Sequence, residues 1–314
     1  MMNGFDNLVL QLKKKYPMLH TFTDRTFGLE IEIFGLNYVI TPVDRGFIKP
    51  YCISSRAKDG RHILDLCRDH RFSLGSSLDS WCFQADNSVR GKGHTRHGAE
   101  LTSPILSGID GMVQVYKAFK LLCDIEGVDI DASCGLHVHH GVDPKEYNCK
   151  ELQQLVRIVH QYEDEFYLLI PGDRRNVETC RPMEIDVKAF LDVCEADSDS
   201  NACRIKQLWY SAANRYNKEC GESSRYDRTR YHGLNLHSYW YRSTIEFRYH
   251  SAILHNIDEA MQWIIFTQFL VELSRGHVPE IYIYSNANKW LQTIYRLYQD
   301  LGYQDRIKRA ANQT

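Results

Sequence analysis

The sequence lacks the marks of several large protein classes. Its ten cysteines include no C-x-x-C pair, and the closest two are nine positions apart, which excludes zinc-ribbon and ferredoxin spacing. The most apolar window, 263–273, is interrupted by Thr267, Gln268 and Glu272 and is too short to cross a bilayer. The N-terminus has no basic stretch followed by an apolar run, so no signal peptide is visible. Ten thiols without an export signal predict a reducing, cytoplasmic location and no membrane partner.

An excess of one charge is also missing. The 314 residues include 38 Lys and Arg against 40 Asp and Glu, for a net charge of −2, which speaks against nucleic acid as the main partner. A basic stretch at 56–97 keeps that alternative open. Hydrophobic residues make up 43% and charged residues 25% of the chain, which is typical of a globular protein and excludes a disordered or fibrous one.

The spacing of apolar residues predicts an α+β fold. Strands are expected at 27–33, 81–89, 99–105, 134–141, 231–239 and 243–250, with a tight turn at Tyr241 and Arg242 between the last two. Helices are expected at 110–126, 150–170, 186–195, 203–217, 257–275 and 286–301, with Asn148 capping the second. Because these elements do not alternate as βαβ units do, we expect a mostly antiparallel sheet with helices packed on one side. No linker divides the chain, so we predict one domain over 1–314, with a motif-bearing core at about 27–275 and a helical C-terminal end at 276–314.

The stretch 27–33 sets two carboxylates on one face of a strand. With a period of two, its apolar residues alternate with Gly28, Glu30 and Glu32. The two glutamates lie about 6.5–7 Å apart along the backbone, and like charges this close raise each other's proton affinity unless a cation or a basic group lies between them. Taken alone, the pair fits a solvated strand face better than a site.

Three later segments repeat this construction. If their strands share a sheet with 27–33, its polar face carries Glu30, Glu32, His137, His139, His237, Glu246 and Arg248. Burying so many ionisable groups without a counterion is costly, so the combination predicts divalent cations, with Arg248 opposite an anion between them. The surplus of carboxylates favours Mg²⁺ or Mn²⁺ over a zinc site built from Cys134, His137 and His139. Each element alone has a plainer interpretation, such as a salt bridge between Glu246 and Arg248.

These segments, in this order, resemble the amidoligase family of the glutamine synthetase and glutamate–cysteine ligase superfamily. The matching motifs run from residue 27 to about residue 254. They are FGLEIE at 27–32, W…DNS at 81–88, AELTSP at 99–104, CGLHVH at 134–139, RRN…CRP at 174–182 and N…TIEFR at 235–248. Each motif is short, and the order and spacing make the resemblance specific.

The resemblance implies a glutamine synthetase-like fold whose concave polar face binds ATP and two divalent metals, Mg²⁺ or Mn²⁺. The implied metal ligands are Glu30, Glu32, Glu100, His137 and Glu246. His139, Arg248 and Asn235 are expected at the nucleotide. One arginine among Arg174, Arg175 and Arg181 is expected to neutralise the transferring phosphoryl group, and Asp86 to contact a substrate or a metal.

The implied activity is an ATP-dependent carboxylate–amine ligase. The γ-phosphoryl group of ATP converts a carboxylate into an acyl phosphate, which an amine displaces to form an amide. An acyl phosphate must be shielded from water, so the basic, glycine-rich loop 90–98 is a candidate lid. The partners are then ATP, a carboxylate and an amine, whose identities the sequence does not name. Glu30→Ala and Glu32→Ala are each expected to abolish turnover and to leave the fold intact or slightly more stable.

Three alternatives stay open at this point. A phosphotransferase related to the guanidino kinases would use the same metals and leave a phosphoramidate. A metal-dependent nuclease would use the same carboxylates and histidines without ATP. A binding module without catalysis would have no need of six intact polar residues, namely Glu30, Glu32, Glu100, His137, Glu246 and Arg248.

Overall fold

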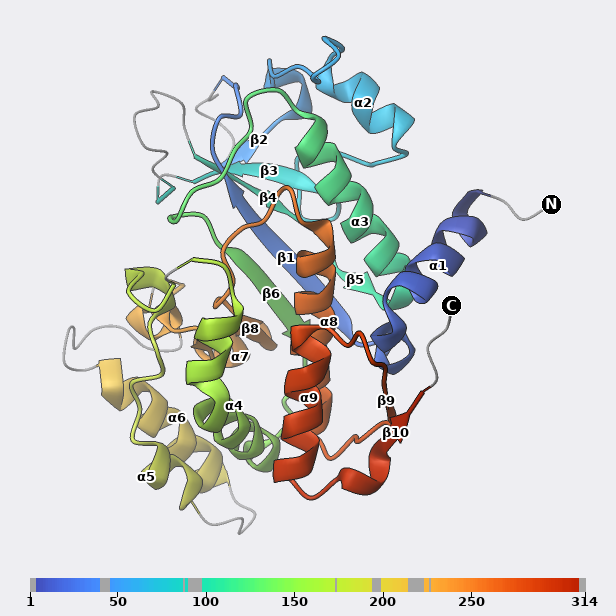
Figure 1. Ribbon diagram of the computed structural model, residues 1–314. Coiled ribbons are helices and arrows are strands. Elements are labelled where there is room, and N and C mark those ends of the chain that lie inside the picture. Colours follow the sequence, from blue (N-terminus) through green and yellow to red (C-terminus); the bar gives the residue numbers. More distant parts are fainter. Residues whose placement is uncertain are drawn as a thin grey trace.

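A computed structural model gives the arrangement of the chain (Figure 1). It describes residues 4–39, 46–86, 88–89, 98–172, 174–193, 199–213, 223–225 and 227–310. Residues 90–97 of the candidate lid therefore lie outside the described residues.

One antiparallel sheet organises the molecule. Its strands follow the order β2-β3-β4-β1-β6-β8-β7, and β5 pairs with β1 as well. The strands are β1 Thr26–Ile33, β2 Phe47–Ile48, β3 Cys82–Ala85, β4 Ala99–Thr102, β5 Leu106–Ser107, β6 Leu136–Gly141, β7 Leu234–Asn235 and β8 Thr244–Phe247. All the described pairs in this sheet are antiparallel. The expected α+β class with a mostly antiparallel sheet is thus confirmed.

Helices follow the predicted apolar stripes. They are α1 Gly4–Lys15, α2 Ile63–Asp69, α3 Gly108–Asp124, α4 Cys149–Leu169, α5 Val187–Leu191, α6 Asp199–Ala213, α7 His237–Arg242, α8 Ile257–Ser274 and α9 Lys289–Asp300. Asn148 caps α4 as predicted, and Glu151 reaches back to its backbone N–H to complete a capping box. Among the described helices, none combines the length and the hydropathy that a bilayer crossing requires.

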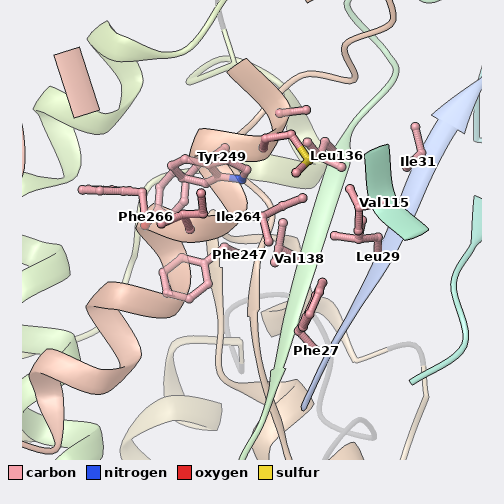
Figure 2. Packing of buried hydrophobic residues seen from close by; sticks show 14 of the residues in the cluster. Phe27, Leu29, Ile31, Val115, Leu136, Val138, Phe247, Tyr249, Ile264 and Phe266 are labelled. Carbon is pink, nitrogen blue, oxygen red and sulfur yellow. The ribbon is translucent and has the colours of Figure 1, made fainter. Parts of the chain in front are cut away.

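The apolar face of the sheet is covered by helices, among them α3 and α8 (Figures 1 and 2). Phe27, Leu29 and Ile31 of β1 are almost completely buried there, and Val115 of α3 and Ile264 of α8 belong to the same cluster. Burial of each large apolar side chain contributes about 1.5–3 kcal/mol, and a slip of one residue would exchange the two faces of a strand. The core therefore fixes the register, and with it the side chains of the opposite face.

The predicted strand 231–239 is wrong. Only Leu234–Asn235 pairs with β8, and residues His237–Arg242 form the short helix α7. The helix ends at Ser243, whose left-handed conformation (φ 56°) turns the chain directly into β8. Aromatic residues suit strands only where they fit the sheet, and here Trp240 packs against the rings of Tyr210 and Trp209.

Two further predictions, which depended on the strand 231–239, are also wrong. Tyr241 and Arg242 form the last turn of α7 rather than a hairpin turn. His237 leaves the polar face, because its Nδ1 atom lies 2.7 Å from the hydroxyl of Tyr210 and its ring stacks on Tyr241.

The C-terminal end is only partly helical, against the prediction for 276–314. Two short strands, β9 Ile281–Ile283 and β10 Ile307–Arg309, pair in parallel on either side of α9 in sequence. Ile281 and Ile283 recur at the period of a strand, but β9 and β10 are both too short to stand out from loops in the sequence.

Candidate active site

The strand register assembles the polar face that the sequence predicted. Glu30 of β1 lies opposite His137 of β6, and Glu32 lies opposite Glu100 of β4. On the other side of β6, His139 pairs with Glu246 of β8. Directly paired residues point to the same face of a sheet, so four strands bring these side chains together. Asn235 of β7 extends the row, since it lies opposite Glu246.

Glu30, His139 and Glu246 have the geometry of a cation site. One ligand atom from each lies within 4.8 Å of the others. The Nε2 atom of His139 is 3.7 Å from Glu30 Oε1 and 3.6 Å from Glu246 Oε1, which is too long for hydrogen bonds. Two ligands that are each about 2.1 Å from a shared ion lie about 3–4 Å apart. The separations therefore fit a common ion.

Two imidazole nitrogens on this face support the same interpretation. The Nε2 atoms of His137 and His139 are buried and have no hydrogen-bond partner among the described residues. His139 is oriented through its other nitrogen, which lies 3.1 Å from the hydroxyl of Thr244. Ligating histidines are commonly held in this way, and an unsatisfied buried nitrogen is costly unless something binds it.

His137 lies between the two glutamates of β1. Its Nδ1 atom is 3.2 Å from Glu30 Oε2, and its Nε2 atom is 3.7 Å from Glu32 Oε1. The resemblance implied that His137 ligates a metal and that His139 contacts phosphate. The geometry places both imidazoles next to the carboxylates, and it is His139 that shares the candidate cation site with Glu30 and Glu246. The implied roles, His137 at a metal and His139 at phosphate, stay predictions.

The electrostatics of this end favour ionised carboxylates. Burial acts to raise the pKa of Glu30, but the neighbouring His137 and His139 outweigh it and hold the pKa well below its ordinary value. Burial acts in the same way on Glu246, and the charges of His139 and Arg248 lower its pKa to about 2. Asn235 also donates from Nδ2 to Glu246 Oε2 at 2.5 Å, so it orients this carboxylate.

The other end of the face is richer in carboxylates. Burial, followed by the negative charges of Glu30, Asp86 and Glu32, raises the pKa of Glu100 well above its ordinary value. Glu32 accepts a hydrogen bond of 2.5 Å from the backbone N–H of Gly135. Asp86 lines the same pocket as Glu100, with one oxygen accepting from the backbone N–H of Ser88 at 2.8 Å. Glu32, Glu100 and Asp86 thus form a second, acidic group next to the first.

Two pockets meet above this face. The apolar pocket, about 660 Å³, is lined mostly by apolar atoms, with contributions from Leu78, Pro104, Ile105 and Val142. The polar pocket, about 450 Å³, is lined by carboxylates and cations that include Glu32, Asp86, Glu100, Glu178, Arg225, Arg230 and Arg248. Glu30 and Arg242 belong to both linings. Both volumes fall within the range of small-molecule sites, about 300–1,000 Å³.

Arg248 lies in the polar pocket, as expected. Its Nη1 atom donates to Glu246 Oε1 at 2.6 Å and lies 3.4 Å from His137 Nδ1. Its Nε atom donates to the carbonyl of Thr179 at 3.2 Å. The guanidinium is therefore fixed by contacts on two sides, next to the carboxylates that would hold a cation.

The structure places none of the three loop arginines in the lining of either pocket. Arg174 is buried, and its guanidinium donates to backbone carbonyls of Ala132, Arg248 and Tyr249 at 3.3–3.4 Å. It therefore braces the backbone beside the site.

Arg175 and Arg181 point elsewhere. Arg175 forms an ion pair with Asp164 and stacks over Tyr167, and Arg181 lies 3.7 Å from Glu184. These arginines were expected at the site because they belong to the RRN…CRP motif at 174–182. The loop instead reaches the polar pocket through residues 177–179.

Sequence reasoning missed three arginines that do line the pockets, namely Arg225, Arg230 and Arg242. The run of arginines at 225–230 was a visible signal for the first two. Nothing in the sequence pointed to Arg242, because it was predicted to lie in an exposed hairpin turn.

The chain was compared with known proteins. A family model described as "Putative amidoligase enzyme" matches residues 23–271, a range that contains every residue of the polar face. No curated protein matches. Among solved structures, glutamine synthetase from Plasmodium falciparum, determined by electron cryomicroscopy, matches with a TM-score of 0.36 and 10% identity, over 89% of this chain and 58% of that chain. The chain therefore spans less than two thirds of the length of that enzyme.

Proposed function

The chain belongs to the amidoligase family, and on this premise we propose that it is an ATP-dependent ligase that joins a carboxylate to an amine through an acyl phosphate. The observation that carries the proposal is the junction of the two pockets at Glu30. Carboxylates, imidazoles and guanidinium groups converge there between an apolar and a polar cavity, and phosphoryl transfer depends on such charged groups to hold cations and to offset charge on the phosphoryl oxygens.

The residues of the polar face would hold two cations. Glu30, His139 and Glu246 fit one ion, and Glu32 and Glu100, paired across two strands, fit a second with Asp86 nearby. Mg²⁺ or Mn²⁺ suits such oxygen-rich ligand sets. When bound, these ions offset the charge on the phosphoryl oxygens during transfer.

The character of the pockets is the basis on which we propose where each substrate binds. The apolar pocket suits the planar base of a nucleotide, and its junction with the polar pocket, next to His139 and Glu30, suits the phosphates. The polar pocket then receives the acid and the amine. An oxygen of the acid forms a bond to the γ-phosphorus as the bond to the bridging oxygen breaks. The amine next displaces phosphate and loses a proton, for which Asp86 and Glu178 line the pocket as bases.

The direct test is product analysis. The protein is incubated with ATP, Mg²⁺ and mixtures of amino acids, dicarboxylic acids and amines, and ADP release is followed by a coupled assay. We expect ADP together with a product whose mass is that of an acid plus an amine less one water. A phosphoramidate would indicate a guanidino-kinase-like activity instead, and no affinity for ATP in the presence of Mg²⁺ would contradict the proposal.

A substitution at Gly28 tests the assignment of the apolar pocket. Gly28 lines this pocket, and a Cβ atom there would meet only Ser103 Oγ, at 3.5 Å, which is an ordinary contact. Gly28→Val is therefore expected to leave the melting temperature nearly unchanged, since valine suits a strand. Its two methyl groups would project into the cavity and should lower the affinity for ATP at least tenfold, as measured by calorimetry. The matched control, Gly28→Ala, should stay within about threefold of the wild type. Wild-type affinity in Gly28→Val would place the nucleotide elsewhere.

A further inference from the structure

Arg242 occupies a position that the amidoligase motifs do not assign. With Glu30, it is one of the two described residues that line both pockets. Its Nη1 atom is 3.5 Å from Glu30 Oε1, the same oxygen that lies 3.7 Å from His139 Nε2. An anion that passes from one pocket to the other, at the Glu30–His139–Glu246 group, therefore passes this guanidinium.

The backbone holds Arg242 in place by an unusual conformation. Ser243 has φ 56°, and among the described non-glycine residues only Arg71 also has a positive φ. Such a conformation is strained and persists where the surroundings require it. Here it ends α7 one residue before β8, and the backbone N–H of Ser243 bonds to the carbonyl of Tyr239 at 3.1 Å. The turn directs the last residue of the helix toward the junction.

The guanidinium of Arg242 also has N–H groups that can donate hydrogen bonds to a ligand. Its side chain is 39% exposed, whereas that of Arg248 is 10% exposed and is fixed to Glu246 at 2.6 Å. The described contacts of the Arg242 guanidinium are the long one to Glu30 and a distant one to the ring of Tyr241, 6.0 Å from its centroid. An arginine fork can donate two parallel hydrogen bonds to the oxygens of one phosphate.

We propose that Arg242 is a catalytic residue that binds the terminal phosphates of ATP at the junction and stays with the γ-phosphoryl group as it moves to the acid. This inference rests on the proposed function and takes the role that the sequence gave to Arg174, Arg175 or Arg181. In the transfer, an oxygen of the acid bonds to the γ-phosphorus, and the electron pair of the broken bond leaves with ADP. Arg242 remains protonated throughout and only stabilises charge.

A series of nucleotides separates this role from a structural one. Calorimetry with Mg²⁺ compares AMP, ADP and a non-hydrolysable ATP analogue for the wild type, Arg242→Gln, Arg242→Lys and Arg275→Gln. Arg275 is a matched control, since it is 35% exposed, pairs with Glu146 and lines neither pocket. We expect Arg242→Gln to lose 10- to 100-fold in affinity for the ATP analogue and less than twofold for AMP. Arg242→Lys should be intermediate, because it keeps the charge and loses the fork.

Two further readings complete the test. Binding of Mn²⁺ without nucleotide, followed by electron paramagnetic resonance, should be unchanged or tighter in Arg242→Gln, because a cation next to Glu30 is removed. Equal losses for AMP and the ATP analogue, or loss of Mn²⁺ binding, would overturn the inference, because the substitution would then have damaged the pocket itself. Unchanged affinity for the analogue in Arg242→Gln would overturn it while leaving the proposed function standing. A wild-type protein without nucleotide affinity would overturn both.

Discussion

Glu30→Gln is expected to abolish ATP-dependent turnover and to destabilise the protein. Glu30 lies next to His137, His139 and Arg242, at distances of 3.2–3.7 Å, and an amide would replace its negative charge with a neutral group. We expect the affinity for Mn²⁺ to fall by at least tenfold. The free energy of unfolding should fall by about 1–3 kcal/mol, because buried charged groups lose an ionic partner. Turnover, Mn²⁺ titration and chemical denaturation provide the three measurements.

This expectation revises one drawn from the sequence, in which removal of Glu30 relieved repulsion from Glu32 and left the fold intact or more stable. In the structure His137 and His139 lie next to Glu30 and lower its pKa, so the attraction to these neighbours outweighs the repulsion from Glu32. Glu126→Gln is the control, since Glu126 is exposed and lines neither pocket. A Glu30→Gln protein that still turns over ATP at the wild-type rate would refute the cation site on β1.

Glu100→Gln is expected to have opposite effects with and without metal. Glu100 is paired across the sheet with Glu32, another carboxylate, and burial and its acidic neighbours raise its pKa. In EDTA the amide should stabilise the protein by about 0.5–1 kcal/mol, because it removes a like charge opposite Glu32. Saturating Mg²⁺ should raise the melting temperature of the wild type and raise that of Glu100→Gln much less, because a ligand to the second ion is missing.

Thermal denaturation at pH 7 in EDTA and in Mg²⁺ gives both comparisons. The difference between the two conditions is the informative quantity, because it cancels effects of the substitution on packing. Glu126→Gln again serves as the control and should show the wild-type difference. If Glu100→Gln destabilises the metal-free protein and keeps the full response to Mg²⁺, Glu100 is not a ligand and its neighbours do not repel it.

The polar face was predictable because successive side chains of a strand point to opposite faces of the sheet. Glu30, His137 and Glu246 alternate with large apolar residues that belong in a core. Once the strands were placed in one sheet, the three polar side chains were therefore expected on one face. The register itself came from the structure. It showed that Glu32 faces Glu100, and that His139 faces Glu246, which spacing along the chain does not determine.

The arginines were not predictable in the same way. A long side chain on a loop or a helix end reaches its partner through tertiary packing, and nearness in sequence to a motif says little about its direction. Arg174 looked like a phosphate ligand and proved to be a buried brace. Arg242 looked like a turn residue until α7 placed it at the junction of the pockets. The pockets were hidden for the same reason, since each is built from several segments far apart in the sequence.

The candidate site and the hydrophobic core are the two faces of the same strands. Leu29 and Ile31 point into the core from the strand that carries Glu30 and Glu32, so the carboxylates cannot separate without breaking the central ladder of the sheet. Local opening, which proteins confine to their weakly packed parts, is then directed to exposed segments such as 73–80, which reaches the apolar pocket through Leu78 and Asp79. Such a segment can change and reshape the pocket that it lines, while the carboxylates of the polar face stay as stable as the sheet itself.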